Sequence, residues 1–293
     1  MNLSTALQAY LIDHQIKGNS VYTIEYYRRS IRQLIVFLGD IETHKMTLDG
    51  LKSYYLHLTA RNITSVSVQS YIRAVRAFVT WCYREDYIPE NLSEKFRLPK
   101  GTRRKIEVLT DIEVTSLLAS FDTKSVIGLR NYCICVLMLD SGLRLNEVVT
   151  LKCSALYISE GYIIVTGKGD KERYVPIGLN TKKNLLRYIM LRGESFKKTA
   201  LFVKDHFMPV SRTTVRQLFR KLKNITGIER LKPHLLRHTF ASRYLEHGGD
   251  IYSLQSILGH TSLEMVKRYV HTIPSKLAVT FTNYSPLDNL LKR

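Results

Sequence analysis

The segment KPHLLRHTF, residues 232–240, places two histidines and an arginine within five positions. Imidazole and guanidinium groups at this spacing could bind a metal ion, bind a phosphate, or form the polar face of an ordinary helix. A zinc-protease helix needs glutamate directly after its first histidine, and here leucine follows His234. Arg237 would also repel a cation, so we expect no metal here. Pro233 predicts that a helix begins at this point, where exposed backbone amides favour an anion.

Phosphate chemistry suits this segment better than metal chemistry. Arg237 carries a planar, permanently charged fork that matches two phosphate oxygens. His234 can donate to an oxygen or transfer a proton near neutral pH. We expect His238 to pack or to bond to backbone. The alternative is purely structural, with a proline at the helix start, a buried Leu235–Leu236 pair and a histidine satisfied by backbone.

The next segment, residues 248–271, has the pattern of a helix, a tight turn and a second helix. Asp250 can cap the first helix and Gly259 can end it. His260 lies in the turn, and Tyr269 follows about two helical turns later. A tyrosine beside a basic phosphate pocket is a candidate nucleophile. The alternative is a DNA-binding helix-turn-helix, in which Tyr269 is only a partly buried aromatic residue.

Two earlier segments could supply further cationic groups. DSGLRLNEVVTL, residues 140–151, places Arg144 between a glycine turn and an amphipathic helix, which Glu147 could orient. TGKGDKERYVP, residues 166–176, places Lys168 between two glycines at the turn of a hairpin, where a backbone can approach a duplex closely. Each segment alone is typical of a solvated surface.

Taken in order, these segments resemble the active site of the tyrosine recombinases, the phage integrase family. The matching motifs are SGLRLNEV, GKGDKERYVP, HLLRHTFAS, LGH and a tyrosine nine residues after LGH, preceded by LTDIEV. The corresponding catalytic positions are Arg144, Lys168, His234, Arg237, His260 and Tyr269. The resemblance spans essentially the whole chain, and the layout is similar to Xer-type and compact transposon- or phage-encoded recombinases.

The resemblance implies that DNA strands are cut and rejoined through a covalent 3′-phosphotyrosyl intermediate. Tyr269 would attack the scissile phosphorus, and His234 would be the proton partner of its hydroxyl. Lys168 would protonate the leaving 5′-oxygen. The bond energy stays in the protein–DNA link, so we expect no cofactor, no ATP and no metal.

The same reaction explains the arginines. A free phenol, with a pKa near ~10, is a poor nucleophile at neutral pH, and the attacked phosphate is already anionic. Arg144 and Arg237 would clamp its nonbridging oxygens, the stabilisation that other phosphoryl-transfer enzymes obtain from metal ions. His260 would hydrogen-bond the phosphate.

The composition agrees with a DNA partner. The chain has 293 residues, 44 Lys and Arg against 25 Asp and Glu, a net charge of +19 and 45% hydrophobic residues. Such an excess of positive charge favours a polyanion, and the resemblance specifies double-stranded DNA with specific recombination sites. The longest apolar run, residues 132–139, is far shorter than the ~20 residues of a membrane span, so we expect no membrane partner. The four cysteines form no CxxC pair, which suits a cytoplasmic, nucleoid-associated protein.

We expect a mainly α, or α+β, fold in two domains. Apolar stripes at helical spacing alternate with arginine clusters in residues 1–98 and predict a four-helix bundle, which the resemblance identifies as the core-binding DNA-binding domain. Residues 99–106 form a basic linker. Residues 107–293 predict a mostly helical domain with a small antiparallel sheet. The resemblance implies that this domain is catalytic and that residues 274–293 form its exchange tail.

Several residues outside the catalytic set are candidates for DNA or protein contact. The arginines expected to contact DNA, through phosphates rather than bases, are Arg28, Arg29, Arg32, Arg73, Arg76, Arg212, Arg216 and Arg220. By resemblance, the tail docks on a neighbouring subunit in a homo-tetramer that holds two DNA sites, with a second recombinase or accessory proteins as further possible partners. Its docking residues would be Leu287, Leu290 and Leu291, unless the tail folds back on its own domain.

Three other functions would each explain only part of the sequence. A non-catalytic helix-turn-helix regulator explains the charge and residues 250–270, but not the positions of Arg144, Lys168 and Arg237. A type IB topoisomerase shares the chemistry but needs neither a compact core-binding domain nor an exchange tail. A two-metal nuclease requires clustered carboxylates, which the sequence lacks.

Overall fold

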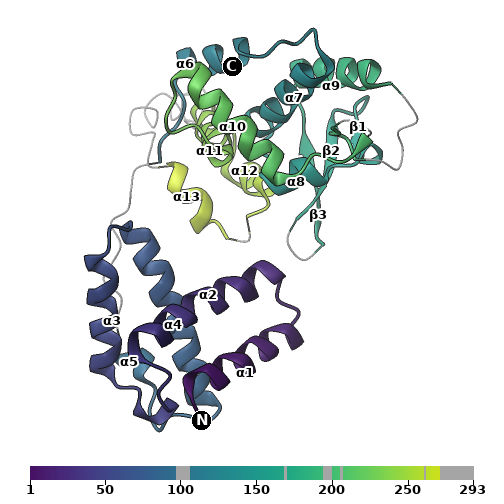
Figure 1. The fold of residues 1–293 in the computed structure, drawn as a ribbon. Coiled ribbons are helices and arrows are strands. Elements are labelled where there is room, and N and C mark those ends of the chain that lie inside the picture. The colour runs from purple at the N-terminus through teal and green to yellow at the C-terminus, as the bar shows by residue number, and fades with distance from the viewer. Residues whose placement is uncertain (97–105, 168–169, 194–199, 205–206, 261, 271–293) are drawn as a thin grey trace, which may run out of the picture. The chain divides into compact units, whose positions relative to one another are not determined.

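A computed structural model describes residues 1–96, 106–167, 170–193, 200–204, 207–260 and 262–270. The chain divides into two units, Met1–Arg104 and Lys105–Arg293, each with a hydrophobic core of its own (Figure 1). The division falls within the segment 99–106 that we expected to be a linker. Among the described residues, no helix has both the length and the apolar character needed to cross a membrane.

The N-terminal unit consists of helices, as the sequence predicts. Three of them start at hydroxyl residues that accept a hydrogen bond from the backbone N–H three positions on: Ser20, Thr47 and Thr64. The elements are α1 (Leu3–Ile16), α2 (Val21–Leu38), the 3₁₀ turn η1 (Thr43–Lys45), α3 (Leu48–Ala60), α4 (Ser65–Arg84) and the short α5 (Leu92–Lys95).

The core of this unit is built from the expected apolar stripes. Ile31 and Leu34 of α2 are fully buried, and so are Val75 and Phe78 of α4. The ring of Tyr10 packs edge-on against Phe78. Arg29 and Arg32 of α2 and Arg73 of α4 are exposed on the surface of this unit, whereas Arg28 and Arg76 are half-buried.

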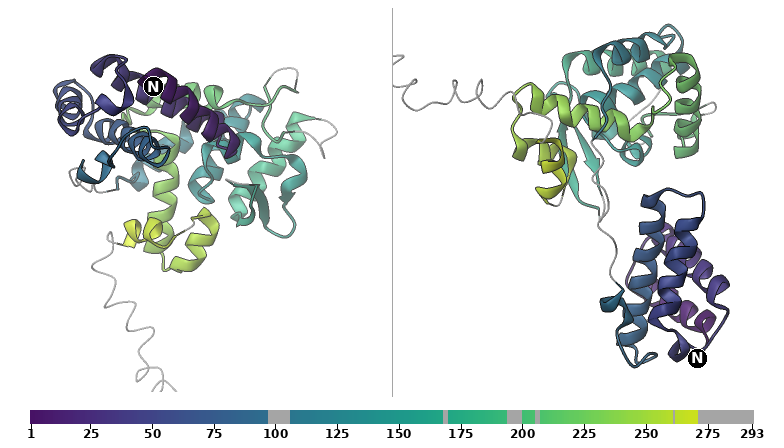
Figure 2. Two further views of the ribbon diagram at one scale, coloured as in Figure 1. Left: turned by 90° about the horizontal axis from the view of Figure 1, so that it is seen from below. Right: turned by 90° about the vertical axis from the view of Figure 1, so that its left-hand side faces the viewer.

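The C-terminal unit is mostly helical and carries one small sheet. Helix α7 packs against α8, α9 and α11 and forms its centre, while the three strands lie together at one edge (Figures 1 and 2). The elements are α6 (Asp111–Ala119), α7 (Val126–Asp140), α8 (Leu145–Thr150), η2 (Cys153–Ala155), β1 (Leu156–Tyr157), β2 (Tyr162–Thr166), β3 (Glu172–Pro176), α9 (Leu179–Arg192), α10 (Arg212–Thr226), α11 (Pro233–Glu246), α12 (Ile251–Leu258) and α13 (Glu264–Val270).

The strands form an antiparallel sheet in the order β1-β2-β3, which confirms the predicted hairpin. Ile163 pairs with Val175 and Val165 pairs with Arg173, and all of these except Arg173 belong to the hydrophobic core. Because alternate residues of a strand face opposite sides, Arg173 occupies the buried side of the sheet. This register places a guanidinium group beside the interior.

Several helix boundaries agree with the local signals in the sequence. Thr110 and Glu113 form the predicted capping box at the start of α6. Asp250 caps α12 by accepting from Ser253 N at 2.7 Å, and Gly259 ends that helix with a φ of 61°. Pro233 occupies the first turn of α11. Residues close in sequence therefore fix the start of α11 and both ends of α12. Of the candidate catalytic residues, His234 follows the start of α11 and His260 follows the end of α12.

Candidate active site

Arg144 stands at the start of α8, directly after a turn that only glycine can form. Gly142 has a φ of 64°, and a Cβ there would lie 2.4 Å from the Phe240 ring. The backbone N–H of Arg144 donates to Glu147 Oε2 at 2.7 Å, and its Nη1 donates to Glu147 Oε1 at 2.9 Å. Its Nη2 donates to the carbonyl oxygen of Gly259 at 3.3 Å. The guanidinium is thus held between two loops, with 33% of the side chain exposed.

Glu147 is a buried carboxylate at the centre of this arrangement, with a relative exposure of 4%. Arg173 of β3 donates to both of its oxygens, from Nη1 at 2.8 Å and from Nη2 at 2.9 Å. Arg173 Nε donates to the carbonyl oxygen of Ile257 at 2.7 Å. Burial raises the pKa of Glu147, but the hydrogen bonds and charges of Arg173 and Arg144 outweigh it and leave the pKa lowered. Glu147 therefore bonds Arg144 directly and stays ionised.

Arg237 on α11 is also buried, with 4% of its surface exposed. Its Nη1 donates to the carbonyl oxygen of Gly142 at 2.6 Å, and its Nη2 donates to that of Leu258 at 2.7 Å. Burial, followed by the positive charge of Arg144, lowers the pKa of Arg237 to about 9, which still leaves it charged at neutral pH. The fork of Arg237 thus joins the turn before α8 to the end of α12.

His260 is brought to Arg237 by the turn at Gly259. Its Nε2 lies 3.1 Å from Arg237 Nη2, and because arginine only donates, this nitrogen accepts. Its carbonyl oxygen accepts from Gln255 Nε2 at 3.1 Å. The structure therefore gathers three of the expected catalytic side chains, Arg144, Arg237 and His260, around one buried network.

The surroundings of the two α11 histidines differ. Much of the surface of His234 is exposed, but the protein atoms around its ring remove part of its hydration. This loss of hydration, followed by the charges of Arg237 and Arg144, lowers the pKa of His234, so it is mostly neutral at pH 7. The rings of His234 and His238 lie 6.4 Å apart. His238 Nδ1 lies 2.8 Å from the hydroxyl oxygen of Tyr269, whose relative exposure is 4%.

This geometry corrects one expectation. We expected His238 to pack or to bond to backbone, but its ring bonds the candidate nucleophile, Tyr269. Among the described residues, no hydrogen bond joins His234 to that hydroxyl, so the role of His234 as proton partner stays a prediction. The sequence also did not single out Arg173, whose partner Glu147 lies 26 residues away. Alternation along its strand, with Arg173 on the side of Val175, was the available signal.

Some expected site residues lie outside the described residues. Lys168 falls between Gly167, whose N–H donates to the Lys171 carbonyl oxygen at 2.8 Å, and the start of β3. The tail leucines Leu287, Leu290 and Leu291 also lie outside. Their roles remain expectations from the sequence.

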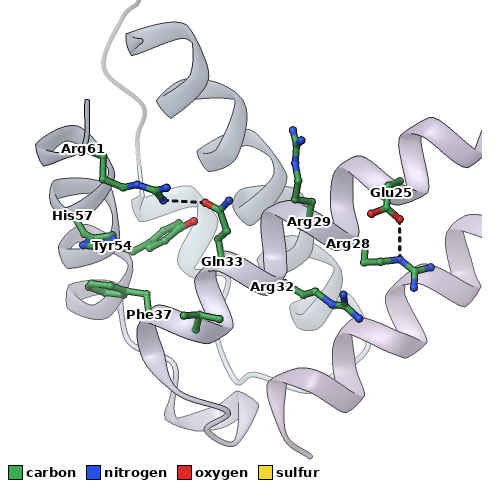
Figure 3. A pocket seen from close by; sticks show the side chains of 10 residues that line it. Glu25, Arg28, Arg29, Arg32, Gln33, Phe37, Tyr54, His57 and Arg61 are labelled. Carbon is green, nitrogen blue, oxygen red and sulfur yellow. Dashed lines mark hydrogen bonds and ion pairs between the residues drawn. The ribbon is translucent and has the colours of Figure 1, made fainter. Parts of the chain in front are cut away.

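The arginines of α2 line an open pocket of about 640 Å³ in the N-terminal unit (Figure 3). One wall consists of Arg28, Arg29 and Arg32, and Glu25 Oε2 lies 3.2 Å from Arg28 Nε. The rest of the lining includes residues that the sequence did not single out: Phe37, also on α2, and Tyr54, His57 and Arg61 of α3 and its C-terminal end. Positively charged and aromatic side chains therefore line the same pocket.

The other arginines that we expected to contact DNA differ in their exposure and in their bonds to the protein. Arg73, Arg216 and Arg220 are exposed, and Arg212 is half-buried at the start of α10. Arg76 Nε instead donates to the carbonyl oxygen of Ser93 at 3.2 Å, which ties it to α5. Arg76 is thus partly engaged in supporting its own unit.

Comparison with known proteins adds independent evidence. The phage integrase family model matches residues 107–275, and the phage integrase SAM-like domain model matches residues 5–98. Tyrosine recombinase XerD of Halalkalibacterium halodurans is 30% identical over 279 residues, which cover 92% of this chain and 93% of that protein.

Two solved structures have a similar fold. The Tn1549 transposon integrase, in complex with a circular intermediate DNA, aligns with a TM-score of 0.76 at 21% identity, covering 90% of this chain and 94% of that one. A lambda integrase tetramer bound to a Holliday junction aligns with a TM-score of 0.73 at 19% identity, covering 89% of this chain and 78% of that one.

Proposed function

The chain belongs to the phage integrase family and is a tyrosine-type site-specific recombinase, and we propose that Tyr269 is its nucleophile. One observation carries this assignment. Arg144, Arg237 and His260 share a buried hydrogen-bonded network, and Tyr269 lies on the helix that packs against the one bearing Arg237. A helix-turn-helix regulator is not favoured, because it needs no such network.

The proposed reaction proceeds by transesterification. The Tyr269 oxygen attacks the scissile phosphorus, an O–P bond forms, and the bond to the 5′-oxygen breaks. A 3′-phosphotyrosyl link and a free 5′-hydroxyl result. A 5′-hydroxyl from the partner DNA then attacks the same phosphorus and releases Tyr269, so the phosphodiester is restored without ATP.

Arg144 and Arg237 would stabilise the charge that develops on the nonbridging oxygens. Preorganised donors of this kind typically contribute ~10²–10³ in rate each. Both guanidinium groups are already oriented by protein acceptors, so little rearrangement is needed when DNA binds. His260 would hydrogen-bond the phosphate, and Lys168 would supply the proton to the leaving 5′-oxygen.

The N-terminal unit would act as the core-binding domain and the C-terminal unit as the catalytic domain. The pocket on α2 would hold backbone phosphates against Arg28, Arg29 and Arg32, with Arg61 as a fourth cationic group. Arg73, Arg76, Arg212, Arg216 and Arg220 would add further phosphate contacts. Double-stranded DNA with specific recombination sites is the proposed partner, in the cytoplasm at the nucleoid.

The proposed active assembly is a homo-tetramer on two DNA sites, by analogy with the lambda integrase tetramer bound to a Holliday junction. Residues 274–293 would serve as its exchange tail, docking through Leu287, Leu290 and Leu291. A second recombinase or accessory proteins would complete it on some sites.

The test is covalent capture of DNA. Fragments from the genomic neighbourhood of the gene are incubated with the wild type and with Tyr269→Phe, denatured in detergent and separated. An adduct formed only by the wild type supports the assignment, and sequencing the trapped DNA identifies the site. If neither protein forms an adduct on nicked substrates although both bind them, the assignment of Tyr269 fails.

A further inference from the structure

We propose that His238 holds the hydroxyl of Tyr269 and receives its proton as the tyrosine attacks. This inference rests on the proposed function of Tyr269 and assigns a further catalytic residue to the same site. The hydroxyl oxygen lies 2.8 Å from His238 Nδ1, a normal distance for a strong O–H···N hydrogen bond. A general base must reach the proton that it removes, and in this structure His238 does so.

The position of His238 on α11 explains why it, rather than His234, meets the nucleophile. Helix α13 packs along α11, and Tyr269 and Val266 both belong to the core on that side. His238 lies one turn further into the helix than His234, whose ring is exposed at the start of α11. The two rings are 6.4 Å apart, so they occupy successive places on one face.

The neighbouring charges favour this proton transfer. Arg237 precedes His238 in the sequence, and its charge and that of an ionised Tyr269 attract one another. An arginine close to the developing phenolate stabilises the negative charge that remains on oxygen as the proton leaves. His234, which stays on the exposed side, is then available to donate to a phosphate oxygen.

The step balances in atoms and charge. Neutral His238, protonated on Nε2, accepts the phenolic proton on Nδ1 while the Tyr269 oxygen forms its bond to phosphorus. The bond from phosphorus to the 5′-oxygen breaks, and that oxygen takes a proton from Lys168. In the rejoining step, Lys168 takes the proton of the incoming 5′-hydroxyl as this oxygen bonds to phosphorus, and the proton on His238 Nδ1 returns to the displaced tyrosine oxygen.

The experiment measures the rate of covalent adduct formation on a nicked duplex carrying the site identified by capture. His238→Ala removes both the hydrogen bond and the proton acceptor, and the expected loss in rate is ~10²–10³-fold. His238→Asn keeps an acceptor near the place of Nδ1 but cannot take up a proton. We expect it to restore part of the rate and to abolish the fall in rate on acidification that comes from protonating the imidazole of His238.

His247→Ala is the matched control. His247 ends the same helix, is exposed, and its Nδ1 lies 2.7 Å from the carbonyl oxygen of Arg243 in the turn before it. Its expected rate equals that of the wild type. His234→Ala should lower the rate while keeping its fall at acidic pH. Circular dichroism and DNA affinity show whether each variant is folded. If His238→Ala does not fold, the pH dependence of His238→Asn tests the inference.

Three results would overturn the inference. The first is a His238→Ala adduct that forms as fast as, or faster than, the wild-type adduct. If His238 only restrained Tyr269, this substitution would release the tyrosine and would not slow its attack. The second is a His238→Asn variant that keeps the fall in rate at acidic pH. The third is loss of that fall in His234→Ala. Failure of the proposed function is distinct, because the wild type itself would then form no adduct.

Discussion

Replacing Glu147 with glutamine should destabilise the catalytic unit strongly. The carboxylate is 4% exposed and accepts from Arg144 and Arg173 at 2.7–2.9 Å. A glutamine side chain retains one oxygen but points an NH₂ group at guanidinium donors. Breaking a buried ion pair costs about 3–5 kcal/mol. We take the lower end, about 3 kcal/mol, because Arg144 keeps access to water.

The assay is thermal unfolding of the full chain. For a domain of this size, a loss of 3 kcal/mol lowers the melting temperature by about 6–12 °C. The control is Glu264→Gln, because Glu264 is 77% exposed and pairs with Lys267 on the surface at 3.1 Å. Surface pairs between neighbouring turns of a helix contribute about 0.3–0.5 kcal/mol, so the control should melt within about 2 °C of the wild type.

The stability that the Glu147 carboxylate contributes should decrease at acidic pH. The pKa of Glu147 is lower in the folded state, so its carboxylate stabilises the fold above the unfolded value of ~4.3. This contribution is lost as the pH falls through the folded pKa. The difference between the wild type and Glu147→Gln should therefore be constant from pH 7 to 5 and shrink below pH ~4. A Glu147→Gln variant that melts with the control at pH 7 would refute the reasoning.

Three further predictions follow from other parts of the chain. The Arg29→Ala/Arg32→Ala variant should bind all duplexes more weakly, and the slope of log affinity against log salt should fall by about 2, as measured by fluorescence anisotropy; an unchanged slope would remove α2 from the DNA interface. Arg144→Lys should keep DNA affinity but slow adduct formation ~10²-fold or more, because lysine lacks the fork; a rate near that of the wild type would contradict the clamp. Gly142→Ala should lower the melting temperature and the cleavage rate together, because its Cβ would lie 2.4 Å from Phe240 at a φ of 64°; a stable, active variant would show that the turn tolerates a side chain.

The local signals in the sequence predicted the helical framework well. The capping box at Thr110, the stop at Gly259 and the hairpin around residues 161–178 depend on neighbours a few positions apart, and all three are present. The fold class is confirmed for the same reason, since apolar periodicity reports directly on packing. The family resemblance supplied the ordered catalytic set, although the roles within that set remain predictions.

The contacts that define the site in detail could not be read from the sequence. Arg173 reaches Glu147 across 26 residues, and His238 reaches Tyr269 across 31. Both depend on how strands and helices pack, which spacing along the chain does not encode. A histidine one turn beyond a recognised motif residue, such as His238, resembles an ordinary packing residue until its neighbour on α13 is known.

The network around Glu147 also leaves the folded domain with unbalanced charge. Three guanidinium groups, those of Arg144, Arg173 and Arg237, surround a single carboxylate. Repulsion between Arg144 and Arg237 contributes to the lowered pKa of Arg237. A scissile phosphate would act as the missing counter-ion, so the DNA that the enzyme cuts should also relieve self-repulsion and make its catalytic domain harder to unfold.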